Sequence, residues 1–217
     1  MKKLLFAAAG VAGVLALSGC GVATEKIDDG GPIAEQVNSV RFDVPVGDVH
    51  VRVEDGAPVS VRRKITFKVS RPGQTYRVEN GALVLGGCGE NCGIVYDVVL
   101  PRELAITGVT GTGQVQIDRA VNVDVRSDVG DIKAYHVSGV LKARVHTGHI
   151  DMSLSKPGGV WALADVGDVT VTVPSGGYRL KANVEVGKTQ ITVPDDQSSP
   201  NELDVRTSTG TVTVKPA

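Results

Sequence analysis

The sequence has few aromatic residues, which make up 4% of its 217 residues and include a single Trp. Surfaces that stack bases, and the energetic centres of tight interfaces, depend on Trp and Tyr, so any aromatic binding platform in this chain must be small. The formal net charge is −1, which gives no basic footprint for nucleic acid. We therefore expect no nucleic-acid partner.

The sequence also has no recognisable catalytic motif. It contains no Gly-x-Ser-x-Gly nucleophile turn, and no phosphate-binding glycine loop precedes a helix, because no helix signal follows the N-terminal region. One local cluster resembles a metal or acid–base site: His146, His149 and Asp151. Its two histidines differ in strand parity and should point apart. We predict a nonenzymatic protein with no cofactor and no metal site.

The N-terminal region carries the only long apolar run. Lys2 and Lys3 precede apolar residues 4–17, a run too short to span a bilayer comfortably, and Leu17-Ser18-Gly19-Cys20 follows. This order resembles the lipobox of bacterial lipoproteins. The resemblance implies a signal peptide over residues 1–19, lipidation of Cys20, and a membrane-anchored protein on the extracytoplasmic side. Acyl chains on Cys20 would provide the membrane contact.

A polar stretch separates Cys20 from the rest of the chain. Residues 20–38 include acidic residues and Gly30-Gly31-Pro32, and they show no apolar periodicity. Such composition disfavours regular structure, so we expect a flexible tether over 20–38 and one folded domain over residues 39–217.

Two further cysteines, Cys88 and Cys92, lie in a glycine-rich segment. In an exported protein such thiols usually pair, and the glycines would let the chain turn tightly enough to bridge them. We predict a disulfide-closed loop. The alternative is a small-ligand or metal-binding lipoprotein that uses both thiols with nearby carboxylates, and the absence of a second Cys pair weakens it.

From Val40 onward, apolar and polar residues alternate. Val169-Thr170-Val171-Thr172-Val173 is one example and residues 121–126 are another. Alternation with period two predicts strands that bury one face and expose the other. Val, Ile, Leu and Ala dominate the predicted inward set, so we expect an all-β domain with a thin aliphatic core.

A glycine recurs in a small-Gly-polar-apolar setting along these strands. From Gly113 onward the successive spacings are 17, 18, 19, 20 and 23 residues. A period near 20 predicts an array, with Gly at the corners because it adopts positive φ without steric cost. We predict a β-helix-like β-solenoid of stacked repeats. The alternative places Gly-Asp and Gly-Gln in hairpin turns of an antiparallel β-sandwich or meander. The repeat glycines are Gly47, Gly113, Gly130, Gly148, Gly167, Gly187 and Gly210.

The Thr-Gly-x-Val and Val-Gly-Asp-Val/Ile units resemble a bacterial β-strand-repeat family known as putative adhesins of unknown function. Its relatives include toast-rack-like domains of envelope-stress proteins. The resemblance covers roughly residues 40–217 and implies a β-solenoid with a role in the cell envelope. We therefore expect a lipid-anchored scaffold or adhesin-like interaction module whose partner is an envelope protein or glycan. The resemblance also suggests an alternative role in envelope-stress sensing.

Several polar and aromatic residues have a simpler structural interpretation. Asp48, Asp131 and Asp168 each follow a repeat glycine, and we expect their carboxylates to bond their own turns. The basic step Arg62-Arg63-Lys64 is typical of a solvated edge strand. Trp161 either covers one end of the core or contacts a partner.

Overall fold

The computed structural model describes residues 24–217, so the predicted signal peptide over 1–19 and the lipidated Cys20 lie outside the described residues. The described part contains strands and no helix, which confirms the all-β prediction. Accordingly, nothing helical within this part could cross a membrane. The strands are β1 (Glu25–Pro32), β2 (Ser39–Val53), β3 (Ser60–Phe67), β4 (Tyr76–Glu79), β5 (Ala82–Gly86), β6 (Cys92–Leu100), β7 (Ala105–Thr112), β8 (Val115–Ala120), β9 (Val123–Val129), β10 (Ile132–Val137), β11 (Leu141–Thr147), β12 (Ile150–Leu154), β13 (Val160–Val166), β14 (Val169–Val173), β15 (Arg179–Ile191) and β16 (Glu202–Pro216).

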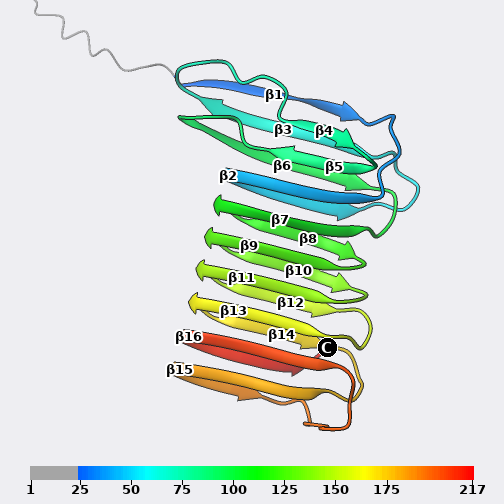
Figure 1. The fold of residues 1–217 in the computed structure, drawn as a ribbon, viewed down its shortest axis with the longest axis vertical. Coiled ribbons are helices and arrows are strands. Elements are labelled where there is room, and N and C mark those ends of the chain that lie inside the picture. The colour runs from blue at the N-terminus through cyan, green and yellow to red at the C-terminus, as the bar shows by residue number, and fades with distance from the viewer. Residues whose placement is uncertain (1–23) are drawn as a thin grey trace, which may run out of the picture.

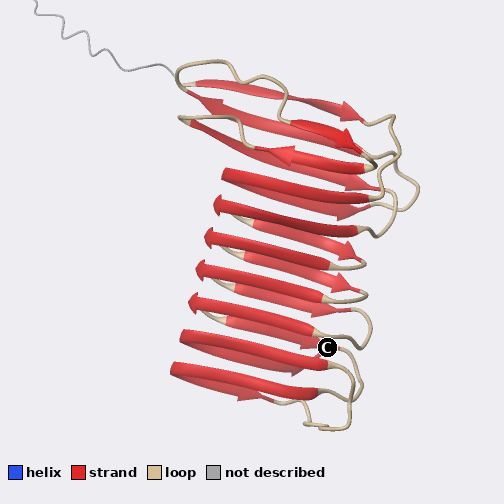
Figure 2. Ribbon diagram, in the orientation of Figure 1, coloured by secondary structure: helices blue, strands red, loops and turns tan. Residues whose placement is uncertain are grey.

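The strands form two parallel ladders. The first ladder runs β2, β7, β9, β11, β13 and β16, and the second runs β2, β8, β10, β12, β14 and β16. Figure 1 shows the repeats stacked one on another, and Figure 2 shows the short connections between successive strands. Parallel pairing is the pattern expected of stacked repeats. Among the described strands, antiparallel pairing, which the sandwich alternative requires, is confined to the pairs β1–β3, β3–β6 and β4–β5.

The core lies between the two ladders and follows the alternation in the sequence. Val169, Val171 and Val173 of β14 are buried, and the residues between them are only partly covered. On β9 the buried positions include Val123 and Val125, whereas Val121 lies before the strand and is 40% exposed. Each repeat presents only a few small aliphatic side chains, so its apolar face needs the neighbouring repeats to cover it.

The last two strands do not stack in chain order. β16 lies between β13 and β15, which makes β15 the final strand of the stack. The apolar face of β15 is incompletely buried, because Leu180, Ala182 and Val184 are only partly covered at the end of the stack. Val186 is 65% exposed, but the valines before other repeat glycines, such as Val166 at 50%, are also exposed inside the stack. Tyr178, just before β15, is fully buried.

The opposite end of the stack is closed by an antiparallel cap. β1 pairs with β3, and β3 pairs with β6, which lies beside β2 (Figure 1). The structure therefore places residues 25–32 of the expected tether in a strand, because each of them faces a residue of β3. It also corrects the interpretation of Arg62-Arg63-Lys64 as an edge strand, since β3 has a partner on both sides.

Two ion pairs link β1 to β3. The Arg63 guanidinium donates to both carboxylate oxygens of Asp29 and also to Gly73 O and Thr75 Oγ1, and 12% of its side chain is exposed. The second pair joins Arg62 and Asp28, both of which are largely exposed. The hydrogen bond from Arg63, with its positive charge, lowers the pKa of Asp29. Arg63 therefore connects β1, β3 and the segment before β4.

We expect Asp29→Asn to loosen β1 more than the matched substitution Asp28→Asn. The first change leaves the partly buried Arg63 without its counter-charge, whereas exposed pairs such as Asp28–Arg62 contribute little. Hydrogen exchange at neutral pH should show faster exchange of β1 amides in Asp29→Asn. Equal exchange in the two variants would contradict the role given to Arg63.

The same contact makes part of the stability depend on pH. Because the folded-state pKa of Asp29 lies below its ordinary value of 3.8, its contribution is present above that value and is lost as the pH falls through the folded-state pKa. Urea denaturation between pH 5 and pH 2 should show a smaller loss of stability in Asp29→Asn than in the parent chain.

Candidate functional site

The repeat glycines form a column along the stack. All seven have positive φ, between 137° and 148°. In addition, each glycine faces the backbone of the repeat beside it: a Cβ on Gly167 would lie 1.8 Å from Gly148 O, and one on Gly210 would lie 2.2 Å from Gly167 O. Only glycine fits at these positions, because the φ angle is positive and the backbone of the adjacent repeat leaves no room for a Cβ. The column of glycines therefore serves the packing of the repeats.

The aspartates that follow these glycines bond across repeats. Asp48 Oδ1 accepts a hydrogen bond from the Gln114 amide, and Asp131 Oδ1 accepts one from the His149 amide, each at 2.8 Å. Asp168 likewise accepts from the amide of Thr211. The expectation that these carboxylates bond their own turns is therefore wrong. They satisfy the backbone of the adjacent repeat, which sequence spacing alone does not reveal.

The histidines of the suspected cluster have separate partners. His146 Nδ1 lies 2.6 Å from Asp165 Oδ2, and His149 Nδ1 accepts from the amide of Asp168 at 3.1 Å. Across residues 24–217, no three His, Cys, Asp or Glu side chains are grouped so that they could hold a metal ion.

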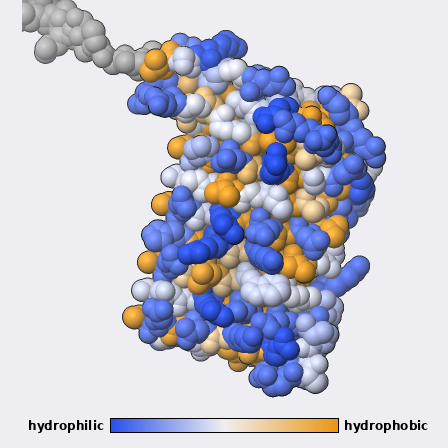
Figure 3. Space-filling view, in the orientation of Figure 1, coloured by the Kyte–Doolittle hydropathy of each residue, from blue (hydrophilic) through white to orange (hydrophobic). Residues whose placement is uncertain are grey.

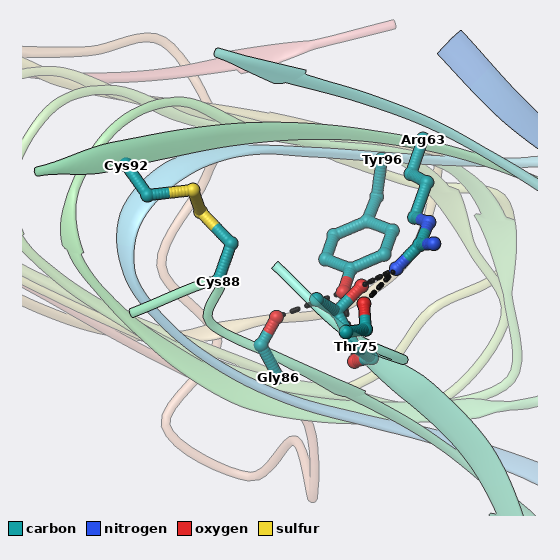
Figure 4. The surroundings of a disulfide bond; sticks show 7 residues. Arg63, Thr75, Gly86, Cys88, Cys92 and Tyr96 are labelled. Atoms are coloured by element: carbon teal, nitrogen blue, oxygen red, sulfur yellow. Dashed lines mark hydrogen bonds between the residues drawn. A yellow bond between two sulfur atoms is a disulfide. The ribbon is translucent and has the colours of Figure 1, made fainter. Parts of the chain in front are cut away.

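The predicted disulfide between Cys88 and Cys92 is confirmed, with the two Cα atoms 5.8 Å apart. Figure 4 shows the bridge beside β6. In the chain-entropy model, closing so short a loop stabilises the fold by about 2 kcal/mol. The paired sulfur atoms are not free thiolates, so the alternative metal site at this loop loses the two ligands on which it depends.

A buried tyrosine fixes the segments around the disulfide loop. The Tyr96 hydroxyl lies 2.8 Å from both Thr75 O and Gly86 O, as Figure 4 shows. Burial raises the pKa of Tyr96 to about 12, so its hydroxyl stays protonated and can donate. Arg63 reaches Thr75 Oγ1 from the other side. This network is structural and offers no reactive group.

Trp161 lies on the outward face of β13 and is 40% exposed, so it does not cover an end of the core. Its ring lies against the backbone at Gly159, where a Cβ would be 3.2 Å from Trp Cζ3. Lys142 Nζ lies 5.3 Å from the centroid of the ring. These contacts hold the indole while leaving part of it accessible.

Trp161 is part of a groove on the outward face of the first ladder, which we call the outer groove. One section has a volume of 320 Å³ and a second has 780 Å³, and the two sections share Asp124 and Arg126. In spatial order, the strands that contribute are β4, β5, β2, β7, β9, β11, β13 and β16. Figure 3 shows strongly hydrophilic side chains interspersed with apolar ones on the face of the molecule turned toward the viewer. The charged residues of the outer groove are Arg41, Asp43, Arg77, Asp124, Arg126, Lys142, Arg144, Asp204 and Arg206.

Not all of these charges are available to a ligand. Arg41 and Arg77 both lie within salt-bridge distance of Glu79, and Arg206 pairs with Asp204 at 2.6 Å. Arg126, in contrast, forms no salt bridge with any residue between 24 and 217.

Two further cations lie beside Arg126. Within the part of the chain that the structure describes, Arg144 forms one salt bridge, to Asp165 at 3.9 Å, and Lys142 lies near the ring of Trp161. The middle of the outer groove therefore has excess positive charge beside the exposed indole.

Strand register brings these residues together. Arg126, Arg144, Leu163 and Arg206 are neighbours in consecutive strands. Each stands four positions before a repeat glycine in the sequence. The row of arginines was not predicted from the sequence, although equal offsets from the repeat glycines would have revealed it.

No family model matches the sequence, and no curated protein is significantly similar to it. Among solved structures, a putative cell adhesion protein from Clostridium sporogenes is similar, with a TM-score of 0.50 and 13% identity over 90% of this chain and 100% of that one. A putative adhesin from Bacteroides fragilis matches with a TM-score of 0.46 and 15% identity over 92% of this chain and 100% of that one. At these identities the likeness concerns the fold alone. The chain is thus similar in fold to a solved structure described as a putative cell adhesion protein, in agreement with the resemblance found in its repeats.

Proposed function

We propose that the protein is a lipid-anchored, nonenzymatic component of the cell envelope that acts as an adhesin-like interaction module. The observation that carries the proposal is the outer groove, a continuous surface across the first ladder with one exposed Trp and with Arg126, which forms no salt bridge among the described residues. The Leu17-Ser18-Gly19-Cys20 sequence supports the anchor, because acyl chains on Cys20 would hold the domain at a membrane.

The fold is well suited to this role. Its two ladders form a rigid wall, because the strands inside the stack are paired on both sides. Side chains on such a wall keep fixed spacings, which lowers the entropy lost on binding. The cations and Trp161 would contact an envelope component, either protein or glycan, while the core-facing residues serve only packing.

In-cell crosslinking of three forms of the full chain tests the proposal: the parent, Cys20→Ala and the double variant Arg126→Gln/Arg144→Gln. We expect the parent to enter the detergent phase and to crosslink to a defined envelope component. Cys20→Ala should move to the aqueous phase because it loses its acyl chains. The groove variant should stay anchored and lose at least nine-tenths of the crosslinked product.

The experiment tests the lipid anchor and the interaction surface independently. Unchanged partition of Cys20→Ala would overturn the lipid anchor. Equal crosslinking by the parent and by the anchored groove variant would overturn the outer groove as the interaction surface.

A further inference from the structure

We propose that the outer groove binds an anionic saccharide polymer, with one sugar ring on Trp161 and its acidic group beside Arg126 and Arg144. The inference rests on the proposed function and gives it a ligand class. It arises from an open indole and two guanidinium groups that strand pairing places side by side, of which Arg126 forms no salt bridge within residues 24–217 and Arg144 only the long one to Asp165.

The indole of Trp161 provides a fixed apolar surface in the outer groove. Trp161 is 40% exposed and is held by the backbone at Gly159 and by Lys142. An aromatic side chain fixed in this way loses little conformational entropy when a ligand covers it, and its apolar surface suits the apolar face of a sugar ring. Leu163, on the same outward face of β13, extends the apolar surface.

Arg126 and Arg144 provide positive charge beside the indole. Arg126 and Arg144 face each other across the β9–β11 pair, about 4.8 Å apart at the backbone. Among residues 24–217, Arg126 forms no salt bridge, and Arg144 forms one long contact, to Asp165 at 3.9 Å. Guanidinium groups bind carboxylate and phosphate oxygens through several N–H donors at once. An acidic group at this point would neutralise a local excess of positive charge.

The outer groove is long enough to hold a polymer. The section around Trp161 crosses β9, β11, β13 and β16, and the adjoining section extends past β5 to Arg77 on β4. The six strand spacings from β16 to β5 alone, at about 4.8 Å each, give a groove on the order of 29 Å long. A groove of this length fits an extended chain better than a single small molecule.

An extended peptide fits these observations less well than a saccharide. Peptides commonly bind sheets by adding a strand to an unpaired edge. The floor of the outer groove consists of strands that already pair on both sides, such as β9, β11 and β13. Recognition must therefore come from side chains, and the groove offers an aromatic ring, guanidinium groups and the carboxylate of Asp124 for hydroxyl groups.

Because Trp161 is the only Trp in the sequence, its fluorescence reports directly on this site. We would titrate the purified full-length protein at low ionic strength with polygalacturonate, with its methyl ester, which keeps the rings and loses the charge, and with poly-L-glutamate, which keeps the carboxylates and lacks the rings. We expect a saturable change in emission with polygalacturonate. Each of the other two polymers should bind at least tenfold more weakly, and added salt should weaken binding.

Matched variants locate the site. Arg126→Gln/Arg144→Gln should weaken polygalacturonate binding at least tenfold, and Trp161→Ala should do the same by calorimetry. The control Lys133→Gln/Lys215→Gln removes two positive charges from the second ladder and should bind like the parent.

Three outcomes would overturn the inference: no binding of polygalacturonate by fluorescence or calorimetry, equal binding of poly-L-glutamate, or an equal loss of affinity in the control variant. Poly-L-glutamate binding would favour an acidic peptide as the ligand. If polygalacturonate fails to bind while in-cell crosslinking still depends on Arg126 and Arg144, the saccharide inference fails and the proposed function stands.

Discussion

Gly167→Ala should destabilise the protein by more than about 4 kcal/mol, enough to prevent folding of a marginally stable domain. Gly167 has φ of 143°, and a Cβ there would lie 1.8 Å from Gly148 O. A residue forced into such a φ costs about 1–3 kcal/mol by itself. The clash adds to this cost because the facing atom belongs to the backbone, and two repeats would have to separate to relieve it. Urea denaturation followed by circular dichroism measures the effect.

Two other glycines serve as controls, because a Cβ added at either position has room. Gly56 has φ of 78° and nothing within 4 Å of an added Cβ, so Gly56→Ala should cost only about 1 kcal/mol. Gly73 is open and has no positive φ, and Gly73→Ala should change stability by less than about 0.5 kcal/mol. Equal losses in Gly167→Ala and Gly56→Ala would show that the column does not depend on close packing of the repeats.

Val171→Asp should unfold the stack, with a loss of more than about 4 kcal/mol at neutral pH. Val171 is fully buried on β14, where it pairs with Met152 of β12 and Val214 of β16. An ionised carboxylate at this position would have no counter-charge among these apolar neighbours. Because adjacent repeats share one core, the damage should spread beyond β14.

The matched control for this prediction is Thr172→Asp, one residue further along the same strand. Thr172 faces outward and lies opposite Lys215 in the register of β14 and β16, so a carboxylate there remains hydrated beside a positive charge. Its stability should stay within about 0.5 kcal/mol of the parent. A melting temperature of Val171→Asp close to that of Thr172→Asp would mean that the assigned inward register is wrong.

The outer groove depends on the same assignment of inward and outward residues as the predictions for Val171 and Thr172. Residues that alternate with the buried set must point outward, and parallel pairing places equal positions of successive repeats in a row. Trp161, Lys142 and Asp124 form one such row, and Arg126 and Arg144 belong to the next. A surface built in this way can change its side chains without disturbing the core, because the two faces of each strand are independent.

Much of this architecture could be predicted from local sequence. Alternation predicted the inward residues of β14, because a strand's period of two assigns each side chain to a face regardless of its partner. The recurring glycines predicted positive φ, and the expected export together with the glycine-rich setting of Cys88 and Cys92 predicted their disulfide.

The sequence by itself thus determined the all-β class, the buried face of most strands, the positions of the repeat glycines and the loop closed by the disulfide. Only the tertiary structure decided which segments are neighbours: β16 between β13 and β15, β1 on β3, and the carboxylate of Asp168 on the amide of Thr211. The physical reason is that every repeat presents nearly the same aliphatic face, so hydrophobic burial fixes orientation without selecting a partner. Contacts that differ from place to place distinguish the neighbours, such as the Asp168 carboxylate on the Thr211 amide and the ion pair of Asp29 with Arg63 in the cap. The resulting order of strands assembles the outer groove.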